Sequence, residues 1–276
     1  MENDVPMESG ERKFLVVQLS DLHCGDLRFD SRLITNCVDA VNALRPDLLV
    51  VAGDLTANGY REEFEEAREY IDAMECPRKI VIAGNHDCRN VGYLHFEEIF
   101  GPRTSTLVFT HSGACGKHLS ERVEVVAVDS NKADLDDGEV GRHNYRFIEE
   151  KFSGDVTFKI FVLHHHLVHV PGTGRERNIV WDAGDVLQVL RNVGVDIVLS
   201  GHKHVPYVWP LDRMYLITSG TACTWRTRGH TPPSYNIVEI EGEEITVHIV
   251  SSPNGERRTE VHPRWWCHER FAGYSR

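Results

Sequence analysis

The chain has 276 residues, of which 41% are hydrophobic and 26% charged, so it is long enough to bury a large core. Its formal net charge of −12 at pH 7 argues against a protein that coats a nucleic acid polymer or binds an anionic membrane. A small anionic substrate stays compatible with that charge, because bound divalent cations reverse the local field.

The seven cysteines are odd in number and irregularly spaced, and none belongs to a CxxC pair. This usage argues against a disulfide framework and indicates a reducing compartment, so we expect a cytoplasmic protein. Residues 1–12 are polar and acidic, unlike a signal peptide, and no apolar run approaches the roughly 18 residues of a membrane span. We therefore expect no membrane partner.

No linker-like or charge-biased stretch divides the chain, so we expect one domain over residues 13–252. Residues 1–12 are predicted to be a frayed N-terminus. Residues 253–276 are expected to be a C-terminal tail to which the sequence assigns no structure, and this tail contains Trp265 and Trp266. The sequence carries no signal for the oligomeric state.

Strand and helix patterns alternate in the first third of the chain. Buried apolar runs predict strands and periodic apolar residues predict helices, in the order strand 14–19, helix 30–44, strand 48–52, helix 61–74 and strand 79–83. This order implies a largely parallel sheet, because the intervening helices act as crossover connections.

The rest of the chain is less regular. Its pattern predicts strands near 106–110 and 122–128, a helix near 142–152, a strand over 157–163, a loop over 167–180, a helix over 183–193 and a strand over 195–199. Short strands near 205–209, 213–218, 235–240 and 244–250 follow, which we interpret as antiparallel hairpins that form a second sheet.

Five polar blocks each follow directly after a strand-like run. They are Asp21-Leu22-His23, Gly53-Asp54, Gly84-Asn85-His86-Asp87, His164-His165-His166 and Gly201-His202-Lys203-His204. Taken alone, each block has an ordinary explanation as a cap, a turn or solvated histidines. Functional groups gather at the carboxyl ends of parallel strands, so their joint position predicts a metal site on the rim of the sheet.

The candidate ligands combine carboxylate, amide and imidazole groups: Asp21, His23, Asp54, Asn85, His165, His202 and His204. This set suits Mn, Fe, Zn or Co better than Ca or Mg, which prefer sites made of oxygen alone. Seven donors are too many for one tetrahedral zinc ion. They suffice for two divalent metal ions that share a carboxylate, an arrangement known to cleave phosphoesters.

The motifs DLH, GDLTANG, GNHD, a strand ending in HH, and GHKH occur in an order that resembles the calcineurin-like metallophosphoesterase superfamily. The resemblance covers roughly residues 13–250. It implies an α/β fold, namely a four-layer αββα sandwich of two mixed β-sheets flanked by helices (the metallo-dependent phosphatase fold), with a dinuclear metal centre.

The resemblance also implies a role for each candidate residue. One ion would be held by Asp21, His23, Asp54 and His204, with Asp54 bridging to the second ion, and that second ion would be held by Asn85, His165 and His202. We choose His165 because the family ligand is the first His of an HHP-like pair, in which Leu167 here replaces the Pro. His86 would stand beside the phosphate as general acid or transition-state stabiliser.

GDLTANG and GNHD differ from the GDYVDRG and GNHE expected of Ser/Thr protein phosphatases. These motifs resemble those of the branch that contains class III cyclic-nucleotide phosphodiesterases and glycerophosphodiesterases. Asn58 lies four residues after Asp54, where it either contacts a substrate phosphate or is an ordinary turn residue before Gly59.

We therefore expect a dinuclear phosphodiesterase that hydrolyses a small phosphodiester by attack of a metal-bridged hydroxide. Its partner would be a small phosphoester and not a nucleic acid polymer. The alternatives are a phosphomonoesterase, a nuclease, or a non-catalytic binding module such as the retromer subunit that resembles phosphoesterases.

Overall fold

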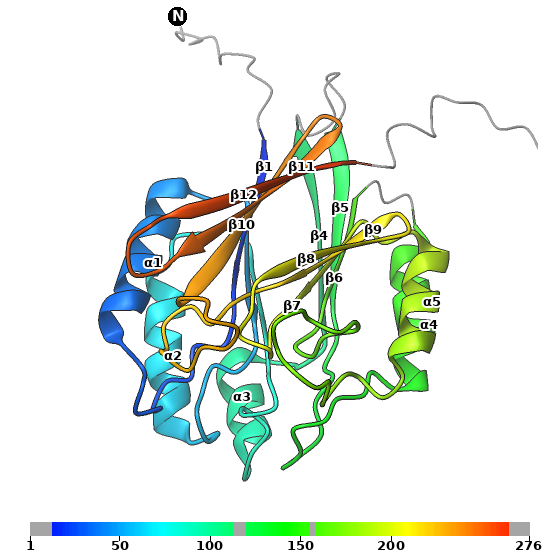
Figure 1. Ribbon diagram of the computed structural model, residues 1–276. Helices are drawn as coiled ribbons and strands as arrows, with labels where there is room; N and C mark the ends of the chain where they lie inside the picture. Colours follow the sequence, from blue (N-terminus) through cyan, green and yellow to red (C-terminus); the bar gives the residue numbers. More distant parts are fainter. Residues whose placement is uncertain (1–12, 113–119, 155–157, 265–276) are drawn as a thin grey trace, which may run out of the picture.

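The computed structural model describes residues 13–112, 120–154 and 158–264 (Figure 1). Its helices are α1 (Ser31–Leu44), α2 (Arg61–Ala73), α3 (Gly92–Phe100), α4 (Arg142–Phe152) and α5 (Ala183–Val193). Its strands are β1 (Phe14–Leu19), β2 (Leu48–Ala52), β3 (Lys79–Ile82), β4 (Ser105–Ser112), β5 (Ser120–Ala127), β6 (Phe158–Val162), β7 (Ile197–Ser200), β8 (Tyr207–Leu211), β9 (Met214–Thr218), β10 (Ser234–Glu241), β11 (Glu244–Ser251) and β12 (Arg257–Pro263).

The strands form two mixed sheets of six strands each. The first sheet has the order β12-β11-β10-β1-β2-β3, in which β1, β2 and β3 are parallel and β10 to β12 are antiparallel to their neighbours. The second sheet has the order β4-β5-β6-β7-β9-β8, with parallel pairing from β5 through β9. The expected parallel arrangement of the first three strands is therefore confirmed.

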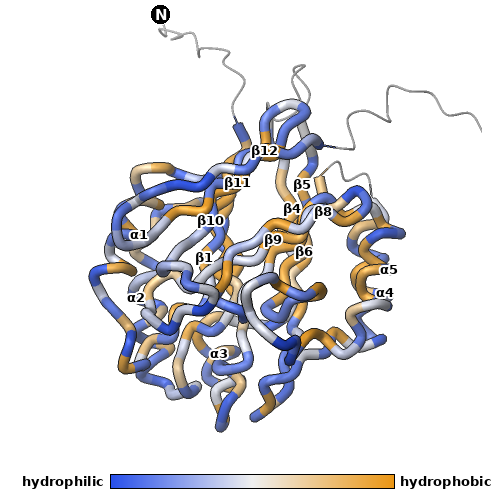
Figure 2. The backbone as a smooth tube through the Cα atoms, viewed as in Figure 1, coloured by the Kyte–Doolittle hydropathy of each residue, from blue (hydrophilic) through white to orange (hydrophobic). Residues whose placement is uncertain are grey.

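Three apolar layers hold the sheets and helices together. The central layer lies between the two sheets. There Val16 and Ile82 of the first sheet and Val162 of the second belong to one buried apolar cluster. A second layer packs α1, α2 and α3 on the first sheet, and a third packs α4 and α5 on the second sheet. Figure 2 shows the apolar segments concentrated along the strands. The result is the four-layer α/β sandwich that the sequence predicts.

The C-terminal part of the chain differs from the sequence interpretation. The hairpins after residue 204 do not form a sheet of their own: β8 and β9 extend the second sheet, whereas β10 to β12 extend the first. Alternating apolar residues predict where a strand lies but not its partner, and here β1 offers an open edge to β10.

Two further elements were not expected. Helix α3 follows the GNHD block, and β12 pairs with β11 along Arg257–Pro263. The first sheet therefore continues past residue 252 as far as Pro263. Residues 1–12 and the Trp265-Trp266 pair lie outside the described residues. Within the described part, none of the helices is long and apolar enough to cross a bilayer.

Phe64 tests the packing of the outer helical layer, because its side chain in α2 is fully buried against the first sheet. We expect Phe64→Ala to lower the free energy of unfolding by about 3–5 kcal/mol, measured by urea denaturation. Leu94→Ala is the control, since Leu94 in α3 is 52% exposed. Equal stability of the two variants would contradict this packing.

Candidate metal centre

The loops after five parallel strands meet at one end of the sandwich. The backbone amide of Asp21, after β1, donates to the Gly53 carbonyl after β2, and that of Gly201, after β7, donates to the His164 carbonyl after β6. The amide of His202 also donates to Asp21 Oδ2, at 3.0 Å, and so ties the two sheets together. The polar blocks after these strands therefore lie together at this end of the sandwich.

The backbone of this cluster is strained. A left-handed φ of 51–71° occurs at five of its residues, namely Asp21, His23, Asp54, His202 and His204. Such φ values are unfavourable for residues with a Cβ and persist where surrounding contacts enforce them, often at functional sites. The turns aim the side chains inward, off the ends of their strands.

The first group of donors consists of Asp21, His23, Asp54 and His204, all buried. The Nε2 atoms of His23 and His204 are 3.1 Å apart. Asp21 Oδ1 lies 3.2 Å from His204 Nε2, and Asp54 Oδ2 lies 3.7 Å from His23 Nε2. Four potential metal-binding atoms therefore converge on one point.

The second group shares Asp54 with the first. Asp54 Oδ1 lies 3.5 Å from His164 Nε2, so the two carboxylate oxygens of Asp54 face different groups. Asn85 Oδ1 lies 3.2 Å from His164 Nε2 and 3.0 Å from His202 Nδ1. The amide of Asn85 is oriented by donation from its Nδ2 to Asp136 Oδ1, at 3.0 Å.

The structure places His164, and not the expected His165, in this second group. Strand alternation is the reason: Val162 faces the layer between the sheets and Leu163 faces the helices, so His164 turns back toward the centre. This geometry favours His164 over the predicted His165 as the candidate ligand. The sequence signal for His164 is the alternation of side chains along the buried strand, and Leu167 in place of the Pro carries no such signal.

The other two histidines of the triplet surround His202. The His165 ring interacts with Ser130 Oγ at 2.9 Å and with the Asp136 carbonyl at 3.2 Å, so both of its nitrogens are occupied. The His166 ring stacks on His202 with centroids 5.7 Å apart and bonds to Glu176 at 2.8 Å. The His165 ring also packs on His202, with centroids 4.6 Å apart, so His202 lies between the two rings' contacts.

Hydrogen bonds to backbone carbonyl groups fix the tautomers of two candidate metal ligands, His164 and His204. The Nδ1–H of His204 donates to the Arg226 carbonyl and that of His164 to the Ala52 carbonyl, because a carbonyl only accepts. In the neutral rings this leaves the lone pair on Nε2, the atom that faces the cluster. This arrangement is typical of histidines that bind metals.

Burial and charge set the protonation of the cluster. Burial lowers the pKa of His23 to about 3 and, together with the neighbouring histidines, holds the pKa of His202 well below its ordinary value. Burial alone would lower the pKa of His164, but the charges of Asp54 and Asp21 outweigh it and raise that pKa to about 9. His23 and His202 are thus neutral, as metal binding requires.

The donor set fits a divalent cation. Asp21 Oδ1 is buried without a hydrogen-bond partner among the described residues, and it points at the Nε2 atoms of His204 and His23. An unpaired buried carboxylate oxygen is costly unless a cation compensates it. Two divalent ions would supply that compensation, and the two buried carboxylates, the amide oxygen and the imidazole nitrogens are ligands that suit such ions.

His86 lies beside the first group but does not belong to either. Its ring packs edge-on against His23, with centroids 4.6 Å apart. Its Nδ1–H donates to the Ala57 carbonyl at 2.6 Å, and its Nε2 lies 3.3 Å from Nη1 of Arg226. Burial lowers the pKa of His86, which favours the neutral ring that accepts from Arg226. The sequence did not single out Arg226 as a neighbour of His86.

Asp87 is a structural residue of the GNHD block. Its fully buried carboxylate accepts hydrogen bonds from the amides of Gly84, Leu55 and Thr56 and from the Thr56 hydroxyl. It thereby locks the loop after β3 to the loop after β2, which carries Asp54.

Asn58 does not reach the cluster. Its exposed side chain donates to Glu63 Oε1 at 3.0 Å, and its backbone amide donates to Glu63 Oε2 at 2.8 Å. Glu63 also occupies the third position of α2, so this contact closes the start of that helix. In this structure the side chain of Asn58 is engaged at the start of α2, and a phosphate contact of Asn58 stays a prediction.

A cavity of about 140 Å³ opens over the donor groups. Its lining combines the candidate ligands Asp54, Asn85, His202 and His204 with His86, Asp136, Asn178 and the basic residues Arg177, Lys203, Arg226 and Arg228. A small anionic group is the ligand that this lining favours.

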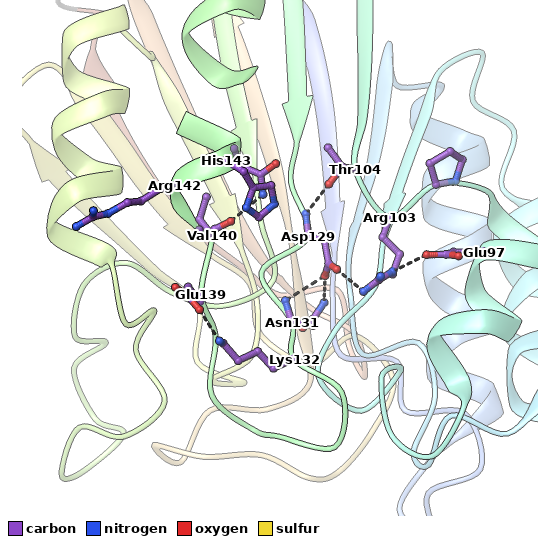
Figure 3. A pocket seen from close by; sticks show the side chains of 13 residues that line it. Glu97, Arg103, Thr104, Asp129, Asn131, Lys132, Glu139, Val140, Arg142 and His143 are labelled. Carbon is purple, nitrogen blue, oxygen red and sulfur yellow. Dashed lines mark hydrogen bonds and ion pairs between the residues drawn. The ribbon is translucent and has the colours of Figure 1, made fainter. Parts of the chain in front are cut away.

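A larger cavity, of about 1010 Å³, lies elsewhere along the loop that follows β5 (Figure 3). Its charged residues largely neutralise one another, with Arg103 bonded to Glu97 and Asp129 and Lys132 bonded to Glu139. In the part of the chain that the structure describes, candidate ligand groups occur only at the Asp54 cluster. We therefore place the chemistry there.

Gly201 tests the close contact between the sheets at this site. A Cβ at this position would lie 1.8 Å from Ser20 Oγ and 2.7 Å from Asp21 Oδ2. We expect Gly201→Ala to lower the free energy of unfolding by about 1–3 kcal/mol in urea denaturation. Gly184→Ala, in α5, meets nothing within 4 Å and is the matched control. A Gly201→Ala protein as stable as that control would contradict the geometry.

Comparison with known proteins agrees with this geometry. The family model for calcineurin-like phosphoesterases matches residues 14–206. A probable cyclic nucleotide phosphodiesterase from Synechococcus is 23% identical over 259 residues, which cover 90% of this chain and 91% of that protein. A probable glycerophosphodiester phosphodiesterase, GpdQ, from Arcobacter nitrofigilis is 36% identical over 93 residues, which cover 30% of this chain and 34% of that protein.

Solved structures share the fold at low sequence identity. GAP50, the anchor in the inner membrane complex of Plasmodium, has a TM-score of 0.70 at 14% identity, over 91% of this chain and 88% of its own. Purple acid phosphatase PPD1 from yellow lupin (Lupinus luteus) has a TM-score of 0.68 at 14% identity, over 94% of this chain and 55% of its own. Because the family model spans more than half of the sequence, the chain belongs to the calcineurin-like phosphoesterase family.

Proposed function

We propose that this protein is a dinuclear metal-dependent phosphodiesterase that hydrolyses a small phosphodiester. The observation that carries the proposal is the pair of buried donor groups that share the Asp54 carboxylate. Asp21, His23, Asp54 and His204 would hold one ion, and Asp54, Asn85, His164 and His202 the other. His165 has no direct place in this set.

The donors suit Mn, Fe, Zn or Co, because they mix carboxylate and amide oxygens with imidazole nitrogens. When bound, two such ions would supply an activated water and neutralise charge on the phosphoryl oxygens. The protein's part is to fix the donors beforehand. Asp136 orients Asn85, and the Ala52 and Arg226 carbonyls orient His164 and His204.

His86 and Arg226 are the residues that we place next to the substrate. Both line the small cavity, and the Ala57 carbonyl keeps His86 Nδ1 protonated and its Nε2 directed at Arg226. A phosphoryl oxygen that enters the cavity can accept from Arg226, which is already charged. His86 serves the leaving oxygen as an acid only after it takes up a second proton on Nε2.

A diester substrate is supported by the two relatives, which are named as a probable cyclic nucleotide phosphodiesterase and a probable glycerophosphodiester phosphodiesterase. Phosphomonoester hydrolysis uses the same donors and is the nearest alternative. A nuclease fits less well, because the formal net charge is −12 and a nucleic acid polymer is strongly anionic.

A non-catalytic binding module on this fold is the alternative of another class. That role does not need an intact set of ligands, whereas this chain retains both donor groups and His86.

We also propose a cytoplasmic location. The support for it is that the cysteines are odd in number and irregularly spaced, which is typical of proteins without a disulfide framework.

The function is tested by loading the purified protein with Mn, Zn or Fe and following hydrolysis of bis-p-nitrophenyl phosphate, a generic diester. We expect turnover that chelation abolishes. His86→Ala should keep both ions and lose about 100-fold or more in kcat. Absence of turnover with every metal, or a His86→Ala protein as active as wild type, would refute the enzyme reading.

The ligand register is tested by metal analysis of two neighbouring variants. We expect His164→Ala to bind one ion per chain and to lose most activity, because the second group loses its imidazole. His165→Ala should keep two ions per chain, since that ring contacts Ser130 and the Asp136 carbonyl. Circular dichroism checks that both variants fold. The reverse pattern of metal content would restore His165 as the ligand.

A further inference from the structure

Four basic residues line the mouth of the small cavity, in a chain whose formal net charge is −12. Arg177 comes from the loop before α5, Lys203 from the GHKH block, and Arg226 and Arg228 from the loop between β9 and β10. These segments are far apart in the sequence, so the fold brings their charges together. Asp136 is the acidic residue of this lining outside the candidate ligands.

Lys203 holds the loop that carries Arg177. Its ammonium donates to the Arg177 carbonyl and pairs with Glu176 at 3.2 Å, and Glu176 is bonded in turn to His166. Lys203 is therefore neutralised within the protein. Its contacts fix the backbone at Arg177 directly over the cavity.

The remaining arginines are less compensated. Arg226 lies 3.8 Å from Asp26 Oδ2, a long ion pair, and 3.3 Å from His86 Nε2. Arg177 and Arg228 are exposed, and within the described residues neither pairs with a carboxylate. Arginines elsewhere on this surface do pair, as Arg61 does with Glu98 and Arg191 with Asp212.

This excess of positive charge is more than a simple diester needs. Two divalent ions, if held beside Asp21 and Asp54, would already outweigh the single negative charge of a phosphodiester. The cavity, at about 140 Å³, is also smaller than the roughly 300 Å³ of ordinary ligand pockets, so most of the substrate extends past the mouth. Arg177 and Arg228 stand at that mouth.

We propose that the substrate carries a second phosphate, which Arg177 and Arg228 bind while the scissile phosphate lies at the ions beside His86 and Arg226. Guanidinium groups suit this role because they donate two parallel hydrogen bonds to phosphate oxygens. The proposal rests on the proposed function and specifies its substrate class. The second phosphate is either the neighbour in a diphosphate diester or a separate phosphomonoester on the same molecule.

The test compares three thymidine substrates with the metal-loaded protein, each followed by chromatography of the nucleotide products. The first is the 4-nitrophenyl ester of thymidine 5′-phosphate, which has one phosphate. The second has an added 3′-phosphate, and the third is the 4-nitrophenyl ester of thymidine 5′-diphosphate. We expect kcat/KM to be about tenfold or more higher for the second or the third than for the first.

Variants assign this preference to the arginines. Arg177→Gln combined with Arg228→Gln should reduce the ratio of kcat/KM values to near one. Arg175→Gln, an exposed residue of the same loop that does not line the cavity, should leave the ratio at its wild-type value. The substrate that is preferred shows which source of the second phosphate the site accepts.

The outcomes separate the two proposals. Turnover of all three substrates at similar kcat/KM, or a preference that survives in the double variant, overturns the second-phosphate site and leaves the phosphodiesterase intact. Cleavage of none of the three, with bis-p-nitrophenyl phosphate also uncleaved, overturns both proposals.

Discussion

The carboxylate of Asp54 is the point on which the rest of this structure depends. It is 2% exposed and lies in the loop directly after β2, an interior strand of the first sheet. One of its oxygens faces His23, and the other faces His164, which follows β6 of the second sheet. Burial alone would raise its pKa, but the positive charge of His164 and the hydrogen bond from that ring hold the pKa of Asp54 well below its usual range. An ionised carboxylate so deep in a protein requires positive charge around it.

The surrounding architecture serves that requirement. Parallel strands of both sheets end at the same place, and left-handed turns at the strand ends point acids and histidines inward. Asp87 joins the loops after β2 and β3, and the His202 amide joins the second sheet to Asp21. The free-energy cost of these strained turns is offset by the packing of the apolar layers behind them. The hydrogen bonds that hold the two sheets and their loops together therefore also position the candidate metal ligands.

The sequence predicted most of this frame because buried strands and amphipathic helices have clear periodicities. It could not predict partners: β10 is as regular as any strand, yet nothing in its pattern shows that it pairs with β1. The candidate site likewise has features that the sequence pattern shows and features that depend on tertiary structure. The polar blocks stand directly after strand-like runs and are visible in the sequence, whereas the choice between His164 and His165 depends on which way the chain faces after Val162. Arg226 is brought beside His86 only by tertiary structure.

We propose that two metal ions lie on either side of Asp54. The most direct measurement is a crystal structure of the manganese-loaded protein with anomalous difference maps recorded at the manganese absorption edge. We predict two peaks about 3.5–4 Å apart, one bound by Asp21, His23 and His204 and the other by Asn85, His164 and His202. A single peak, or a second peak bound by His165 in place of His164, would contradict the account.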